Sequence, residues 1–177
     1  MRTDVPNGRV FWGAALGVVV LDLVTKVLAQ RHLVEHLPVD VIGSWVRFTL
    51  AYNPGAAFSM HLGPFSRYIF GAFAVIALFV LFRMAQKAMP QEWLLTLGLG
   101  LAWGGAAGNL VDRVRSPRGV VDFIDVGTAS WRFWTFNVAD SAVTVGAILL
   151  AWLLSREQPS TPPETPPGSS AGTPGVS

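Results

Sequence analysis

The sequence predicts an all-α integral membrane protein, with four transmembrane helices and a small β-containing surface segment between the first and second helices. Composition is the first reason, because 51% of the 177 residues are hydrophobic and only 14% are charged. The second reason is that four apolar stretches each approach the ~20 residues that a helix needs to cross the hydrocarbon core of a bilayer. Backbone groups in lipid must be hydrogen-bonded within the protein, so these stretches are predicted to be helices rather than open strands.

The four predicted spans cover residues 10–29, 68–84, 93–111 and 137–154. The first span resembles a cleavable signal peptide in its position. It is too long for one, it carries Asp22 and Lys26, and no convincing small-residue cleavage site precedes Gln30. We therefore interpret it as a membrane span.

Two polar segments connect the spans. Within residues 31–66, the stretch 39–50 is rich in β-branched and aromatic residues and partly alternates, which predicts one or two short strands at the membrane face. Residues 52–55 have the composition of a turn, and residues 112–136 join the third and fourth spans. The prediction is one membrane-embedded domain over residues 1–155, followed by a disordered tail at 156–177 that is rich in Pro, Ser, Thr and Gly.

Several classes of function are excluded by what the chain lacks. It has no cysteine, so it has no disulfide, thiol nucleophile or thiolate metal site. His32 and His36 have i,i+4 spacing but lack the glutamate of a zinc-protease motif, so we expect no metal and no cofactor. A net charge of only +2, without a basic cluster interleaved with aromatic residues, argues against nucleic acid as a partner.

Asp122 and Asp140 are the candidate catalytic residues. Both are surrounded by apolar residues at the edges of hydrophobic segments, where an ionisable group is a functional candidate. A carboxylate at the centre of a bilayer costs roughly 2.5–3.5 kcal/mol on insertion scales. The two acids lie 18 residues apart on either side of one loop, so we expect a helical hairpin to bring them together. Two adjacent carboxyl groups share a proton and act as acid and base, which is the chemistry of an aspartic protease.

Other polar residues have structural interpretations. Asp22 and Lys26 share a helix face at i,i+4 and are expected to form an ion pair. Asp112 is expected to pair with Arg113 or Arg115 and to be structural.

The small residues at 104–108 are expected to let helices approach closely. Asn137 has the position of a helix N-cap with Asp140 three residues later, which favours the fourth helix but leaves Asp122 unexplained.

Five segments, taken together and in order, resemble the motifs of the lipoprotein signal peptidases, also called signal peptidase II. They are DLVTK at 22–26, NPGAAFS at 53–59, GGAAGNLVDR at 104–113, VVDF at 120–123 and FNVADS at 136–141. The resemblance covers residues 10–154 and leaves out only the Pro-rich tail. Each motif alone is weak, but five at family-like spacing around four spans are specific.

The resemblance implies an aspartic endopeptidase that removes signal peptides from diacylglyceryl-modified prolipoproteins by cutting before the lipidated cysteine. It implies that Asp122 and Asp140 are the catalytic pair and that no metal is needed. The residues that the resemblance implies for substrate binding or support of the site are Asp22, Lys26, Asn53, Gly55, Asn109, Asp112, Arg113 and Asn137. The expected partners are prolipoproteins and membrane lipid, and the protein is expected to be a monomer.

The same resemblance implies a multi-pass protein of the bacterial inner (cytoplasmic) membrane, with both termini in the cytoplasm and the active site near the outer leaflet. The distribution of arginines favours the opposite orientation, since more of them lie on the side of the two connecting segments than on the side of the termini. Arginines held by an active site weaken that count, so the expectation follows the resemblance.

Three rival functions remain open at this point. A transporter or proton channel would use Asp22, Asp122 and Asp140 as a relay. A serine protease would use Ser59 or Ser141 with Lys26 as base, although the chain has no GxSxG motif. In a non-enzymatic assembly factor, the polar residues would only join helices.

Overall fold

The computed structural model describes residues 5–55 and 63–156. The four predicted spans are confirmed as the helices α1 (Gly8–His32), α2 (Ser66–Lys87), α3 (Trp93–Arg115) and α4 (Val138–Arg156). Each is long and apolar enough to cross a membrane. Most of the helices extend a few residues past the predicted apolar stretches. The prediction followed hydrophobicity and so left out polar residues of the last turns, such as Arg31 and Arg115. The predicted disordered tail lies almost entirely beyond the described residues.

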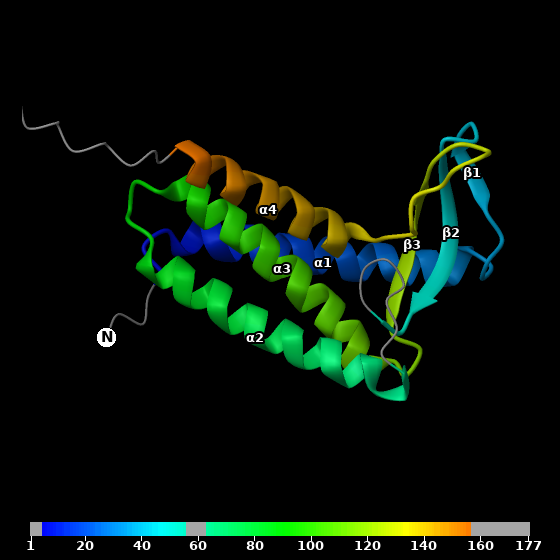
Figure 1. The fold of residues 1–177 in the computed structure, drawn as a ribbon, viewed down its shortest axis with the longest axis horizontal. Helices are drawn as coiled ribbons and strands as arrows, with labels where there is room; N and C mark the ends of the chain where they lie inside the picture. Colours follow the sequence, from blue (N-terminus) through cyan, green and yellow to red (C-terminus); the bar gives the residue numbers. More distant parts are fainter. Residues whose placement is uncertain (1–4, 56–62, 157–177) are drawn as a thin grey trace, which may run out of the picture.

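Helix α3 is the centre of the bundle and packs against each of the other three helices (Figure 1). Its small residues make this possible, as predicted for residues 104–108. A Cβ atom at Gly104 would lie 2.6 Å from the carbonyl oxygen of Ala15 in α1, and one at Gly108 would lie 2.6 Å from a carboxylate oxygen of Asp22. Only glycine therefore allows α1 and α3 to approach this closely, and the approach determines which polar groups of the two helices meet.

A three-stranded antiparallel sheet stands at one end of the bundle, where α1 ends and α4 begins (Figure 1). Its strands are β1 (Val39–Ile42), β2 (Val46–Asn53) and β3 (Val120–Val126), in that order. The predicted strands between the first two helices are confirmed. The turn predicted at residues 52–55 begins later, because β2 extends through Asn53 by pairing with β3.

Strand β3 was not predicted, because its segment was interpreted only as a polar connection between the third and fourth spans. The strand places Asn53 opposite Val120, Tyr52 opposite Val121 and Ala51 opposite Asp122. Two motifs that are far apart in the sequence therefore lie side by side. The chain just before α4 is tied to the same strand, since the backbone N–H of Ile124 donates to the carbonyl oxygen of Phe136 at 2.8 Å.

Candidate active site

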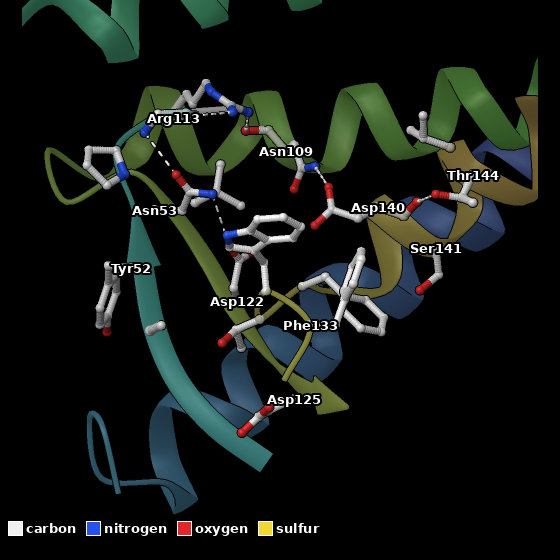
Figure 2. A pocket seen from close by; sticks show the side chains of 18 of the residues that line it. Tyr52, Asn53, Asn109, Arg113, Asp122, Asp125, Phe133, Asp140, Ser141 and Thr144 are labelled. Carbon is white, nitrogen blue, oxygen red and sulfur yellow. Dashed lines mark hydrogen bonds between the residues drawn. The ribbon is translucent and has the colours of Figure 1, made fainter. Parts of the chain in front are cut away.

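Asp122 and Asp140 line one cavity, at the junction between the sheet and the helices (Figure 2). Asp122 comes from β3 and Asp140 from the first turn of α4, so a strand and a helix bring them together rather than the helical hairpin that we expected. Asn137 donates to Asp122 Oδ1 at 2.7 Å, and Asn109 donates to Asp140 Oδ1 at 2.7 Å. The two amide side chains are hydrogen-bonded to each other at 3.1 Å, which links the carboxyl groups through one continuous network.

The N-terminus of α4 is capped by the same residues that reach the acids. The backbone N–H of Asp140 donates to Asn137 Oδ1 at 2.9 Å, and that of Asn137 donates to Asp140 Oδ2 at 3.2 Å. This reciprocal pair satisfies donors that the helix cannot satisfy itself. The capping interpretation of Asn137 is therefore correct, and the fully buried Asn137 side chain bonds Asp122 in addition. The same residues therefore cap α4 and hold the two acids in place.

A buried cluster of charges lies behind the two acids. The ammonium group of Lys26 lies 2.7 Å from Asp22 Oδ2, 2.8 Å from Asp112 Oδ2 and 3.0 Å from Asn109 Oδ1. The expected Asp22–Lys26 pair is thus present. The prediction that Asp112 pairs with Arg113 or Arg115 is wrong, because the close packing of α1 on α3 brings Lys26 to it instead. The guanidinium of Arg113 reaches the backbone carbonyl oxygens of Asn109 and Gly55.

This cluster holds the residue before each candidate catalytic acid. Asp22 Oδ1 accepts the backbone N–H of Ala139 at 2.9 Å, directly before Asp140. Asp112 Oδ2 accepts the backbone N–H of Val121 at 3.2 Å, directly before Asp122. Since one lysine forms ion pairs with both supporting carboxylates, Lys26 fixes the backbone of β3 and of α4 relative to each other.

The remaining predicted residues surround the mouth of the same site. Asn53 donates to Asp122 Oδ2 at 3.3 Å, and its own Oδ1 accepts the backbone N–H of Gly55 at 2.9 Å. Arg113 donates to the carbonyl oxygen of Gly55 at 2.9 Å, so α3 is joined to the end of β2. The rest of the second motif, residues 56–59, lies outside the described residues. All ten residues predicted for the site therefore belong to one contiguous network.

The electrostatics of Asp122 suit acid–base chemistry. Burial, and after it the negative charge of Asp140, raises the pKa of Asp122 to about 7, although Asn53 and Asn137 donate hydrogen bonds to its carboxylate. Near neutral pH the pair can therefore hold one proton between two carboxyl groups, and the titration belongs to the pair rather than to either residue. One group is then ready to donate a proton while the other accepts one.

The cavity has a volume of about 1110 Å³, and apolar side chains form most of its wall. The lining residues that were not predicted include Asp125, Arg132, Phe133 and Trp134. The run Trp131–Trp134, with an arginine between aromatic residues in a loop that follows two aspartates, is the sequence signal that could have indicated them. Among residues 5–55 and 63–156, no three His, Cys, Asp or Glu side chains gather as metal ligands.

The serine protease alternative finds little support. Ser141 lines the cavity, but its hydroxyl donates to the carbonyl oxygen of Asn137 at 3.0 Å. Lys26 is engaged by two carboxylates and is not available as a base. Ser59 lies outside the described residues.

The chain is similar to known proteins in sequence and in fold. The family model described as signal peptidase (SPase) II matches residues 14–156. The lipoprotein signal peptidase of Teredinibacter turnerae is 42% identical over 80% of this chain and 84% of its own length. That of Mycolicibacterium smegmatis is 42% identical over 94% of this chain and 73% of its own. A bacterial membrane enzyme solved by the in meso method at 2.3 Å superposes with a TM-score of 0.74 at 31% identity, over 81% of this chain and 85% of that one.

Proposed function

Since the chain belongs to the signal peptidase II family, we propose that Asp122 and Asp140 are the pair with which it cleaves lipoprotein signal peptides. The enzyme is an aspartic endopeptidase of a bacterial membrane, and its substrates are prolipoproteins. The observation that supports the assignment is that these two carboxyl groups line one cavity and are joined by the amides of Asn109 and Asn137. A channel or an assembly factor does not account for this arrangement within a peptidase family.

The two acids take different roles in the resting enzyme. Asp140 accepts hydrogen bonds from Asn109 and from the backbone N–H of Asn137, at a helix N-terminus that stabilises negative charge. Asp122 has its pKa raised to about 7 by burial and by the charge of Asp140. We therefore assign the base to Asp140 and the acid to Asp122.

Cleavage follows from these roles. Ionised Asp140 takes a proton from a water molecule, and the resulting hydroxide attacks the carbonyl carbon of the scissile peptide bond. Protonated Asp122 donates its proton to the carbonyl oxygen as the tetrahedral intermediate forms. When the intermediate collapses, Asp140 returns its proton to the departing amine, Asp122 takes back a proton from a hydroxyl of the intermediate, and the C–N bond breaks to give the carboxylic acid and the amine.

The substrate is proposed to be diacylglyceryl-modified and to be cut directly before the lipidated cysteine. The cavity lies at one end of a bundle of four apolar helices and is largely lined by apolar side chains. Acyl chains that stay in the bilayer beside these helices would hold the scissile bond at the level of the two acids, since each buried CH₂ contributes about 0.8 kcal/mol.

The orientation is proposed to have both termini in the cytoplasm and the sheet at the outer leaflet. Helix α1 begins, and α4 ends, at the end of the bundle opposite the sheet (Figure 1). The protein is proposed to act as a monomer, because one chain supplies all ten residues of the site, from α1, β2, α3, β3, α4 and the residues next to β2 and α4.

The test is the loss of cleavage in two nearly isosteric variants. We expect Asp122→Asn and Asp140→Asn each to lower kcat by at least about 10²–10⁴-fold, the contribution of general acid–base catalysis. Cleavage of a purified diacylglyceryl prolipoprotein is followed by mass spectrometry, which also locates the cut. Asp40→Asn, at an exposed position of β1 away from the cavity, is the matched control and should keep normal turnover. Normal turnover by a folded Asp122→Asn or Asp140→Asn variant would contradict the assignment.

A further inference from the structure

One wall of the cavity is a short arch of chain between β3 and α4. Phe133, Trp134 and Thr135 all line the cavity, and Figure 2 shows Phe133 between the strand of Asp122 and the helix of Asp140. Phe133 and Trp134 keep 42% and 48% of their surface exposed, although their rings contact each other with centroids 5.4 Å apart. Phe133 and Trp134 therefore present aromatic surface to a molecule bound in the cavity.

The two ends of the arch are held in different ways. At the α4 end, Phe136 exchanges backbone hydrogen bonds with Ile124 of β3 at 2.8 and 2.9 Å. At the other end, the backbone N–H of Phe133 donates to the carbonyl oxygen of Val126 at 2.8 Å, and that of Trp131 donates to the hydroxyl of Thr128 at 3.1 Å. The side chain of Arg132 adds a bond to Asp125. Backbone bonds between Phe136 and β3 fix the α4 end, whereas the other end is held also by the side chains of Arg132 and Thr128.

Arg132 connects three parts of the chain. Its Nε donates to Asp125 Oδ1 at 2.6 Å, and one terminal nitrogen donates to the backbone carbonyl oxygen of Asp125 at 3.1 Å. The other terminal nitrogen donates to the carbonyl oxygen of Ser44, in the turn between β1 and β2, at 2.9 Å. The planar guanidinium presents its N–H donors in a rigid fork that fits these three separated acceptors, whereas a lysine ammonium is a compact point charge without that fixed geometry.

The carboxylate of Asp125 is buried and fixed in the position where it binds Arg132. The residue is only 7% exposed, and its second carboxylate oxygen accepts the hydroxyl of Thr49 in β2 at 3.1 Å. Charge-assisted hydrogen bonds of this kind are about twice as strong as neutral ones. The pair takes no part in the network around Asp122 and Asp140, so the mechanism above leaves it without a role.

We infer that Asp125 and Arg132 are positioning residues for signal-peptide cleavage, whose ion pair holds the arch Phe133–Trp134–Thr135 as a binding wall for the prolipoprotein. The inference rests on the proposed function of the cavity. It predicts an effect on substrate binding rather than on the chemical step. Loss of the pair loosens the arch at the end near Arg132, while Phe136 keeps Asn137 and Asp140 in place through its backbone bonds to β3.

The experiment measures kcat and KM of the full-length enzyme, in detergent or lipid nanodiscs, with a diacylglyceryl prolipoprotein. We expect Asp125→Asn and Arg132→Gln each to raise KM by about tenfold while kcat stays within about twofold, the pattern of lost uniform binding. The double variant should be no worse than either single variant, because the two residues act as one unit. Thr49→Val removes one bond to Asp125 without changing charge, and should raise KM by a smaller factor.

The matched control is the other arginine–aspartate pair of the sheet. Arg47 Nε lies 2.9 Å from Asp40 Oδ1 between β1 and β2, and neither residue lines the cavity. Arg47→Gln should leave KM unchanged. Hydrogen–deuterium exchange adds a readout that is independent of turnover: the amides of residues 127–135 should exchange faster in Arg132→Gln, and those of α4 should not.

Three results would overturn the inference: an unchanged KM in both pair variants, an equal rise of KM in Arg47→Gln, or a fall of kcat with KM unaltered. The proposed function is tested separately in the same assay. Turnover by Asp122→Asn would contradict the catalytic pair, whereas wild-type cleavage with an unchanged KM in the Asp125 and Arg132 variants contradicts only the positioning role.

Discussion

At the scale of single residues, the proposed chemistry depends on which of the two aspartates, Asp122 or Asp140, carries a proton. Asp122 and Asp140 are the same residue type, but their surroundings separate the roles that we propose for them. Asp122 lies buried on a strand, while Asp140 lies in the first turn of a helix and lines the same cavity. Pairs of acids in different environments divide the work of donor and acceptor in this way in many hydrolases.

The raised pKa of Asp122 predicts the alkaline limit of activity. The acid must carry its proton when the substrate carbonyl is attacked. Burial and the charge of Asp140 raise its pKa to about 7, so the competent form prevails below that pH and is lost above it. We expect kcat/KM to fall tenfold per pH unit above about pH 7. Initial rates measured from pH 5 to pH 9 would check this, and a rate that stays level up to pH 9 would exclude Asp122 as the acid.

At the scale of secondary-structure elements, Lys26 joins three of them. Through Asp22 and Asp112 it connects α1 to the backbone before Asp140 and to the backbone before Asp122. Its side chain is only 2% exposed, so the charge is almost completely buried. Removing it leaves two buried carboxylates without a counter-ion.

Lys26→Met should therefore destabilise the enzyme by about 3–5 kcal/mol, the cost of breaking a buried ion pair by removing one partner. Thermal unfolding in detergent measures the change, and activity should fall with stability. Adding Asp22→Asn should recover part of the loss, because one of the two unpaired charges is then gone. Lys87→Met, at the exposed end of α2, is the control and should have little effect. An equal effect of the two lysine substitutions would contradict the role of the cluster.

The close approach of α1 to α3 is a second property of the elements. A Cβ atom at Gly104 would lie 2.6 Å from the carbonyl oxygen of Ala15, so Gly104→Ala must push the two helices apart. We expect a lower melting temperature together with lower activity, because Lys26 then moves away from Asp112. Gly17→Ala in α1 is the control, since a Cβ there meets nothing within 4 Å and alanine favours a helix. A melting temperature unchanged by Gly104→Ala would show that this contact does not limit packing.

For the whole molecule, the relevant property is the location of a peptidase site within a membrane protein. Four apolar helices carry a small sheet at one end, and the cavity lies where the two meet (Figure 1). Under the proposed function, a peptide that is held in the bilayer by its lipid would reach this junction by diffusion in two dimensions. The helix bundle would then contribute to substrate selection as well as to anchoring.

We predict that a prolipoprotein with an unmodified cysteine is cleaved far more slowly than the same protein with a diacylglyceryl group. Neither EDTA nor thiol reagents should inhibit the reaction, because two carboxyl groups suffice for it and the chain has no cysteine. Time courses with the two substrates, with and without each reagent, would test this. Equal rates on both substrates would contradict recognition of the lipid, and inhibition by EDTA would contradict the two-aspartate mechanism.

The sequence by itself determined the properties that local patterns encode. Apolar stretches of membrane-spanning length gave the four helices, because the thickness of a bilayer sets the length of a span. The Asp22–Lys26 pair and the Asn137–Asp140 cap were visible too, since i,i+4 and N-cap spacings follow from the geometry of one helix. The five motifs indicated the family, and with it the candidate acids.

Only the tertiary structure decided which distant groups meet. Asp112 has two arginines beside it in the sequence, yet it pairs with Lys26 of another helix, because glycines in α3 let α1 come close. Strand β3 forms because β2 offers it a partner, and its pairing brings Asn53 to Asp122. The Asp125–Arg132 pair likewise depends on a turn from a third part of the chain. Helix periodicity specifies which face of a segment is buried, but the partner of that face is fixed only when all segments pack together.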